Sequence, residues 1–75
     1  MQELANSTTP TPLHKQIRLA RRTLELSQLE VAHNVGISQS QYSLFEQGYV
    51  KLSVDVIHTI QAFLDAVQQR GLLHV

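Results

Sequence analysis

The side chains best suited to recognise another molecule are a group of glutamine and serine residues in the middle of the chain. Gln39, Ser40 and Ser43 are spaced so that they share one side of a helix, and Leu44 lies on the same side. A glutamine amide can pair with adenine, serine can bond to any base, and an exposed leucine can touch the thymine methyl group. These four residues therefore predict a face that reads base edges.

Positive charge is gathered in an earlier segment. Six Lys+Arg balance six Asp+Glu, so the formal net charge is zero, and on that count alone a nucleic-acid partner is not indicated. Four of the six basic residues nevertheless fall within positions 15–22. We expect phosphate contacts from this cluster and the loop beyond the reading helix, although a solvated basic face is an open alternative. The candidates are Lys15, Arg18, Arg22 and Lys51, with the backbone N–H groups around Gln47 and Tyr49.

Length and composition limit the classes of protein that need to be considered. A chain of 75 residues is one small domain, and one this short usually needs disulfides, a metal or a partner subunit for stability. Cysteine is absent, which excludes a disulfide framework and a cysteine-ligated zinc site. The remaining possibilities are a compact helical core or an oligomer.

Catalytic and membrane-spanning patterns are missing from the sequence. The four histidines lack the i, i+4 spacing of helical zinc ligands, and no nucleophile elbow or phosphate-cradling glycine loop occurs. No run of 18 apolar residues or secretory signal is present. We therefore expect a cytoplasmic protein that is not an enzyme and has no metal, cofactor, membrane contact or small-molecule ligand.

Helix signals divide the chain into four segments. We expect Thr11 to cap a helix that begins at Pro12, and apolar residues spaced by four, three and four then continue to Leu24. Capping boxes at Ser27 and Ser38 start two short helices, which end at Gly36 and Gly48. Ser53 caps a longer helix that ends near Gly71. The expected organisation is a flexible arm (1–12), a helical domain (13–67) and a tail (68–75).

The fourth helix and the tail carry more apolar surface than one small core can cover. The apolar residues of this helix that cannot all face one small core are Val54, Ile57, Phe63, Leu64 and Val67. Exposed apolar patches mark interfaces, so we expect dimerisation here, with a tail folded back on its own core as the alternative. The expected dimerisation residues are Phe63, Val67, Leu72, Leu73 and Val75.

The two short central helices have the requirements of a helix-turn-helix. Ala32 is small enough to let the helices approach, Gly36 turns the chain, and Tyr42 and Phe45 point inward. The segments 26–32 (LSQLEVA), 35–38 (VGIS) and 45–48 (FEQG) together resemble the phage repressor and Cro family, the lambda-repressor-like or XRE type. The resemblance covers about residues 13 to 65, and it implies an all-α bundle of four to five helices.

The resemblance also assigns roles to individual positions. It implies that Gln28 clamps a DNA phosphate, that Gln39 and Ser40 read bases, and that Glu46 pairs with an arginine of the first helix. Here that arginine is Arg21, and the pair would be structural. Helix capping and solvent exposure are the alternative explanation for the three polar residues.

Three residues depart from the family pattern. Glu25 stands where the family commonly has glycine, so we expect a side chain at a position that needs a positive φ. Tyr42 is bulkier than the usual valine or isoleucine, and Leu44 is apolar where a polar reader is more common. None of the three breaks the motif.

The resemblance implies a transcriptional regulator that binds double-stranded DNA as a homodimer, a repressor occupying an inverted-repeat operator. The alternative is an antitoxin or antirepressor-type adaptor, in which the same fold binds a protein partner through the fourth helix and tail. The zero net charge and Leu44 favour this alternative.

Overall fold

Four helices make up the described part of the chain. The computed structural model describes residues 10–73, with side-chain surroundings given up to residue 71, and no strand occurs within this range. The all-α class predicted from the sequence is confirmed. The helices are α2 (Leu13–Thr23), α3 (Gln28–Val35), α4 (Gln39–Glu46) and α5 (Val54–Leu73).

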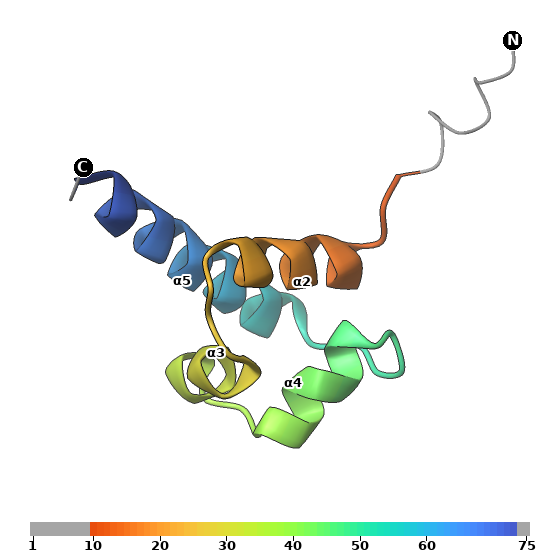
Figure 1. Cartoon of the computed structure of the whole chain (residues 1–75). Coiled ribbons are helices and arrows are strands. Elements are labelled where there is room, and N and C mark those ends of the chain that lie inside the picture. Colours follow the sequence, from red (N-terminus) through yellow and green to blue (C-terminus); the bar gives the residue numbers. More distant parts are fainter. Residues whose placement is uncertain (1–9, 74–75) are drawn as a thin grey trace, which may run out of the picture.

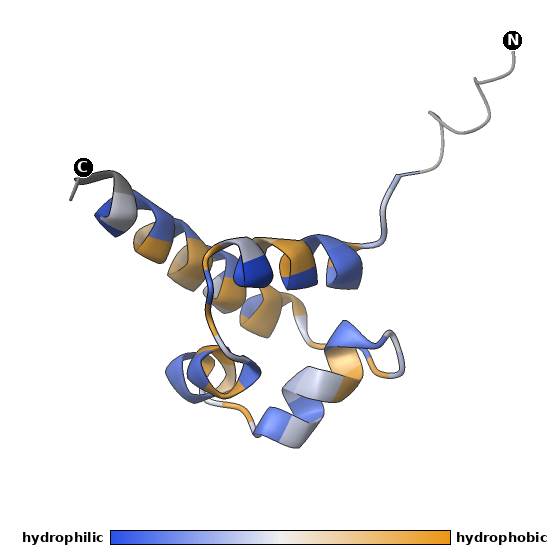
Figure 2. Ribbon diagram, in the orientation of Figure 1, coloured by the Kyte–Doolittle hydropathy of each residue, from blue (hydrophilic) through white to orange (hydrophobic). Residues whose placement is uncertain are grey.

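The helices pack around one small core (Figure 1). α2 and α5 cross in contact with each other, α3 packs against α4 and α5, and α4 also contacts α2. Each helix turns an apolar side inward, as Figure 2 shows by its colouring. The buried apolar residues are Ile17, Val31, Ala32, Tyr42, Phe45, Ile60 and Leu64. The last turns of α5 extend past the other three helices, and no described helix is both long and apolar enough to cross a membrane.

The start and end of α3 follow the sequence signals. Ser27 accepts a hydrogen bond from the N–H of Glu30 at 3.0 Å, and its own N–H donates to the Glu30 carboxylate at 2.7 Å. Gly36 ends the helix at φ 82°, a left-handed conformation that glycine adopts without strain. The second box is only half formed between described residues: the Ser38 hydroxyl accepts from the N–H of Gln41 at 3.0 Å without a reciprocal bond. A neutral Gln41 amide is a weaker acceptor than the ionised Glu30 carboxylate.

The outer ends of the helical domain differ from the sequence prediction. Pro12 precedes α2 in an extended conformation, and the Thr11 carbonyl, not its side chain, accepts a hydrogen bond from Gln16 Nε2 at 2.6 Å. The Pro12 carbonyl accepts from the N–H groups of Lys15 and Gln16 at 3.0 and 3.1 Å, so Pro12 takes the capping position and the helix starts one residue later than expected. At the other end α5 passes through Gly71 to Leu73. Gly71 has no positive φ, so the expected end of the helix near this residue is wrong.

The structure describes only part of the predicted arm and tail. Residues 1–9 of the arm and residues 74–75 of the tail, Val75 among them, lie outside the described residues. The expected start of the tail at residue 68 falls inside α5, because the sequence 68–73 (QQRGLL) continues the helix. The side chains of Leu72 and Leu73 are also outside the described surroundings.

The turn between α2 and α3 places a side chain in the left-handed region. Glu25 has φ 60°, as expected from its departure from glycine at this position. Its N–H donates to the carbonyl of Arg22 at 2.9 Å, and the N–H of Leu26 donates to the carbonyl of Arg21 at 3.1 Å. These bonds end α2 and set the direction in which α3 begins.

Replacing Glu25 with glycine should stabilise the domain. We expect Glu25→Gly to raise the free energy of unfolding by about 0.5 to 1 kcal/mol, because glycine enters the left-handed region without the Cβ penalty. Urea denaturation measures the difference. Glu25→Ala is the matched control, since it removes the carboxylate and keeps the Cβ, and we expect it to stay within about 0.5 kcal/mol of wild type. Equal stability of the glycine and alanine variants would contradict the strain at this residue.

Candidate nucleic-acid interface

The residues predicted to read bases line one open hollow on the surface. Its walls are Gln39, Ser40, Ser43 and Leu44 of α4, together with Gln28 from the start of α3. The other side of α4 is anchored in the core, because Tyr42 and Phe45 are buried. The fold therefore brings together five residues that are up to 16 positions apart in the sequence, and it fixes the helix that carries four of them.

Exposure along α4 matches a surface available for contact. Gln39 and Ser40 are exposed at the N-terminal turn, Ser43 is half-buried, and Leu44 keeps 41% of its surface exposed. None of these side chains carries a charge. The hollow can thus offer hydrogen-bond donors, acceptors and one apolar contact, which is the chemistry of base edges in the major groove.

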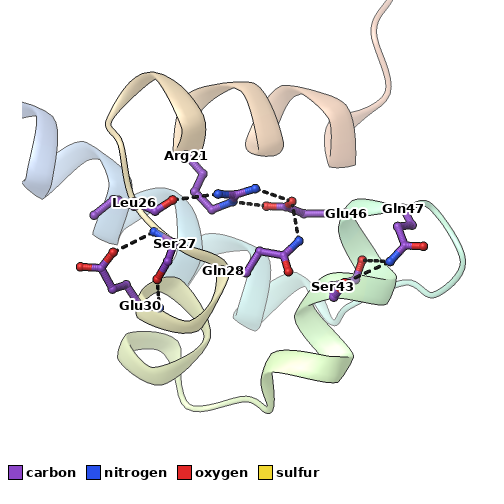
Figure 3. Close-up of polar contacts among 8 residues, drawn as sticks. All are labelled: Arg21, Leu26, Ser27, Gln28, Glu30, Ser43, Glu46 and Gln47. Carbon is purple, nitrogen blue, oxygen red and sulfur yellow. Dashed lines mark hydrogen bonds and ion pairs between the residues drawn. The ribbon is translucent and has the colours of Figure 1, made fainter.

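A buried ion pair holds α4 against α2 (Figure 3). Arg21 Nε lies 2.6 Å from Glu46 Oε2, and Arg21 Nη2 lies 2.9 Å from Glu46 Oε1, which makes a two-bond pairing. The two residues are only 8% and 1% exposed. The third guanidinium nitrogen, Nη1, donates to the carbonyl of Leu26 at 2.7 Å, in the turn before α3. Arg21 and Glu46 are thus paired as the family resemblance implied. Arg21 also binds the turn before α3, a contact that was not predicted.

Gln28 is tied to the same pair. Its Nε2 donates to Glu46 Oε1 at 3.1 Å, and the side chain is half-buried (Figure 3). The sequence pattern left the Gln28 amide free for a phosphate, but one of its two N–H groups is used inside the protein. The carbonyl oxygen and the second N–H are left for a ligand.

The protonation states around the pair follow from burial and hydrogen bonding. Burial has the largest single effect and would raise the pKa of Glu46, but hydrogen bonding to its polar neighbours, Arg21 first among them, and the positive charge of Arg21 together lower this pKa below its ordinary value of 4.5. Hydrogen bonding to Glu46 likewise raises the pKa of Arg21. Burial raises the pKa of the Tyr42 hydroxyl, for which no hydrogen-bond partner is found within residues 10–73. The pair is therefore fully ionised at neutral pH.

The basic residues do not surround the hollow. Arg22 is exposed and Arg18 half-buried on α2, while Lys15 lines a groove between α2 and α5. Lys51 lines a second groove, formed by α2, α5 and the loop before α5. None of the four contributes to the walls of the hollow. The walls of the hollow therefore carry no positive charge.

The backbone N–H groups expected to hold a phosphate after α4 are already used. The N–H groups of Gln47 and Tyr49 donate to the carbonyls of Ser43 and Leu44 at 3.1 and 2.9 Å, because they end the helix. These two N–H groups are therefore not free to bind a phosphate. The side chains stay accessible. Tyr49 is 74% exposed, and the exposed Gln47 donates from Nε2 to the Ser43 hydroxyl at 3.0 Å and to the Ser43 carbonyl at 3.3 Å. The N–H groups of Val50 and Lys51, which the sequence analysis missed, take part in no hydrogen bond within the described residues.

The residues expected at a dimer interface are only partly described. Phe63 and Val67 are half-buried on α5, and Phe63 also packs against the core. Val54 is 67% exposed, as expected for a helix with more apolar surface than the core can cover. Ala32 is 1% exposed between α3 and its neighbours, which is consistent with its predicted spacing role.

The stability of the domain should depend on the charge of Glu46. Because its pKa is lowered by folding, its contribution is fully present above pH 4.5 and is lost as the pH falls through the lowered pKa. We expect the free energy of unfolding, measured in urea from pH 7 to pH 3, to decline in that acidic range. The control replaces the pair together, Arg21→Met with Glu46→Leu, because apolar replacement of a buried ion pair is often neutral or stabilising. A control with the same acid dependence as wild type would contradict this assignment.

Comparison with known proteins agrees with the geometry. A family model described as helix-turn-helix, of the Cro/C1 type, matches residues 17–68, which is more than half of the chain. No curated protein and no solved structure matches the chain. The matched segment contains the ion pair, both short helices and the hollow. The family is a DNA-binding and regulatory one, not a catalytic one. The chain belongs to the XRE family of helix-turn-helix proteins and is a DNA-binding transcription regulator.

Proposed function

We propose that the protein is a repressor that binds an inverted-repeat operator as a homodimer. In this proposal α4 enters the major groove, its exposed side chains read bases, and residues around it hold phosphates. The observation that carries the proposal is the hollow shared by α3 and α4, which gathers the predicted readers on a rigid support. The reading residues are Gln39, Ser40, Ser43 and Leu44. The phosphate-contacting residues are Gln28, Lys15, Arg18, Arg22, Gln47, Tyr49 and Lys51.

The chemistry of the face favours readout over simple charge attraction. Gln39 and Ser40 occupy the first turn of α4, the part of a recognition helix that contacts base edges. Leu44 follows one turn later and is exposed enough to meet a thymine methyl group. Each good bidentate contact contributes about 1–3 kcal/mol of discrimination between bases. Sequence preference is therefore expected to come from uncharged contacts.

Electrostatic attraction to DNA should be modest. The net charge is zero, and no basic side chain lines the hollow. Each neutralised phosphate adds about 0.9 to the slope of log affinity against log salt concentration on B-DNA. A few phosphate contacts give a shallow slope and weak nonspecific binding.

A dimer would bury apolar surface that so small a domain cannot cover by itself. The end of α5 projects beyond the other helices (Figure 1). Val67 of α5 is half-buried. Two-fold pairing would place two α4 helices about 34 Å apart, one turn of DNA. The proposed contact residues are Phe63, Val67, Leu72, Leu73 and Val75.

An adaptor function is the second candidate, and one surface favours it. The second groove is lined by apolar residues of the loop before α5 and of α5 itself, among them Val50, Leu52, Val54 and Ile57. Exposed apolar surface of this kind is typical of protein contacts. In this alternative the chain would bind a protein partner, as an antitoxin or antirepressor-type adaptor does, and α4 would play no part in sequence readout.

The double variant Gln39→Ala, Ser40→Ala tests the reading face. We expect it to stay folded by circular dichroism and to bind DNA upstream of its own gene at least about tenfold more weakly than wild type. Gel shifts at two salt concentrations provide the affinity and the salt slope, and the slope should not change because no phosphate contact is lost. Gln41→Ala is the matched control, an exposed glutamine of α4 outside the hollow. Binding of the double variant at wild-type strength would contradict the assignment.

Removal of Leu72 to Val75 tests the dimer. We expect the shortened chain to sediment as a monomer in analytical ultracentrifugation at concentrations at which the full chain sediments as a dimer, because apolar contact area is lost. Val54→Ser serves as the control for a change in exposed apolar surface at the other end of α5, and it should leave the dimer intact. A shortened chain with unchanged mass would remove the tail from the interface.

A further inference from the structure

Gln28 is the one wall residue of the hollow that is bonded to the buried ion pair among the described contacts. Glu46 Oε1 accepts from Gln28 Nε2 at 3.1 Å and from Arg21 Nη2 at 2.9 Å. The pair is thus connected through a single oxygen atom to the surface proposed to meet DNA. The connection runs from α2 through α4 to the first residue of α3.

The bond to Glu46 fixes the orientation of the Gln28 amide. A glutamine amide has a donating end and an accepting end, and either could face outward if nothing inside distinguished them. An ionised carboxylate only accepts, so a reversed amide would bring two acceptor oxygens together. Figure 3 shows the nitrogen of Gln28 directed at Glu46 and its oxygen directed away from that carboxylate.

We propose that Glu46, held by Arg21, is a positioning residue for DNA recognition, because it orients Gln28 so that the carbonyl oxygen and one N–H face the hollow. This inference rests on the proposed function. The hollow then presents a fixed acceptor beside a fixed donor at the start of α3. The Gln28 amide would therefore match a DNA site that offers a hydrogen-bond donor, such as the exocyclic amino group of a base, next to an acceptor on a phosphate or a base.

A purely structural role for the pair predicts a different behaviour. Two apolar side chains of similar volume could hold α2 against α4 equally well, since buried ion pairs are often replaceable without loss of stability. Apolar side chains could not orient an amide. The pair's contributions to folding and to recognition can therefore be separated by one double replacement.

The experiment compares four full-length proteins: wild type, Arg21→Met with Glu46→Leu, Gln28→Ala, and the three changes combined. Urea unfolding reports stability, and fluorescence anisotropy reports affinity for the DNA fragment bound by wild type. We expect the double replacement to stay folded and to bind roughly three- to tenfold more weakly, the typical effect of one hydrogen bond. We expect the triple variant to bind no more weakly than Gln28→Ala, because both changes act through the same amide.

Two results of these binding measurements would overturn the inference. One is wild-type affinity in the folded double replacement, and the other is losses that multiply in the triple variant. The loss of affinity in the double variant Gln39→Ala, Ser40→Ala, measured in the same way, separates the positioning role from the proposed function. If that variant binds weakly while the double replacement does not, only the positioning role fails; if wild type has no sequence preference at all, the proposed function fails and takes this inference with it.

Nuclear magnetic resonance of wild type without DNA provides an independent readout, which holds even if the double replacement does not fold. The two Nε2 protons of Gln28 should be clearly separated in chemical shift, and the bonded one should exchange slowly with water. Control signals come from Gln41, an exposed glutamine with no side-chain hydrogen bond among the described contacts. Gln28 protons that exchange as fast as those of Gln41 would overturn the inference.

Discussion

The guanidinium of Arg21 and the carboxylate of Glu46 meet where α2, α3 and α4 come together, and this contact joins all three helices through hydrogen bonds. The two-bond pairing ties α4 to α2, and the remaining guanidinium nitrogen ties the turn before α3 to both. A buried charge without its partner destabilises a protein strongly, so each residue requires the other. In a domain with a core of seven buried apolar residues, one such contact has a large influence.

The surface proposed to meet DNA lies on α4, the helix that carries Glu46. Tyr42, Phe45 and Glu46 hold α4 from within, which leaves its uncharged outer face free. The zero net charge is compatible with this arrangement, because base readout by amides and hydroxyls needs no charge. In the proposed function the basic residues of α2 serve as modest phosphate contacts, and α5 provides the surface for a second copy.

Local signals in the sequence predicted much of this fold. The capping box at Ser27, the left-handed turn at Gly36 and the inward positions of Tyr42 and Phe45 each depend on short-range chemistry that neighbouring residues reveal. The helix boundaries at Pro12 and Gly71 were less predictable, because proline is tolerated both inside and just before a helix, and glycine both inside one and at its end.

Features that depend on three-dimensional placement were beyond the reach of the sequence. Spacing indicated that Gln28 stood at a helix start, but only the packing of α3 on α4 brings its amide within 3.1 Å of Glu46. The N–H groups of Gln47 and Tyr49 were predicted to bind a phosphate, but in the folded chain they donate to carbonyls of α4. Likewise, counting basic residues could not show that Lys15 and Lys51 line grooves away from the hollow.

The central claim is that α4 reads DNA sequence from a paired protein, and selection of bound DNA from a random pool tests it most directly. The account predicts enrichment of one sequence with two-fold symmetry, its half-sites centred about one helical turn apart. Recovery of DNA with no common sequence after repeated rounds would contradict it.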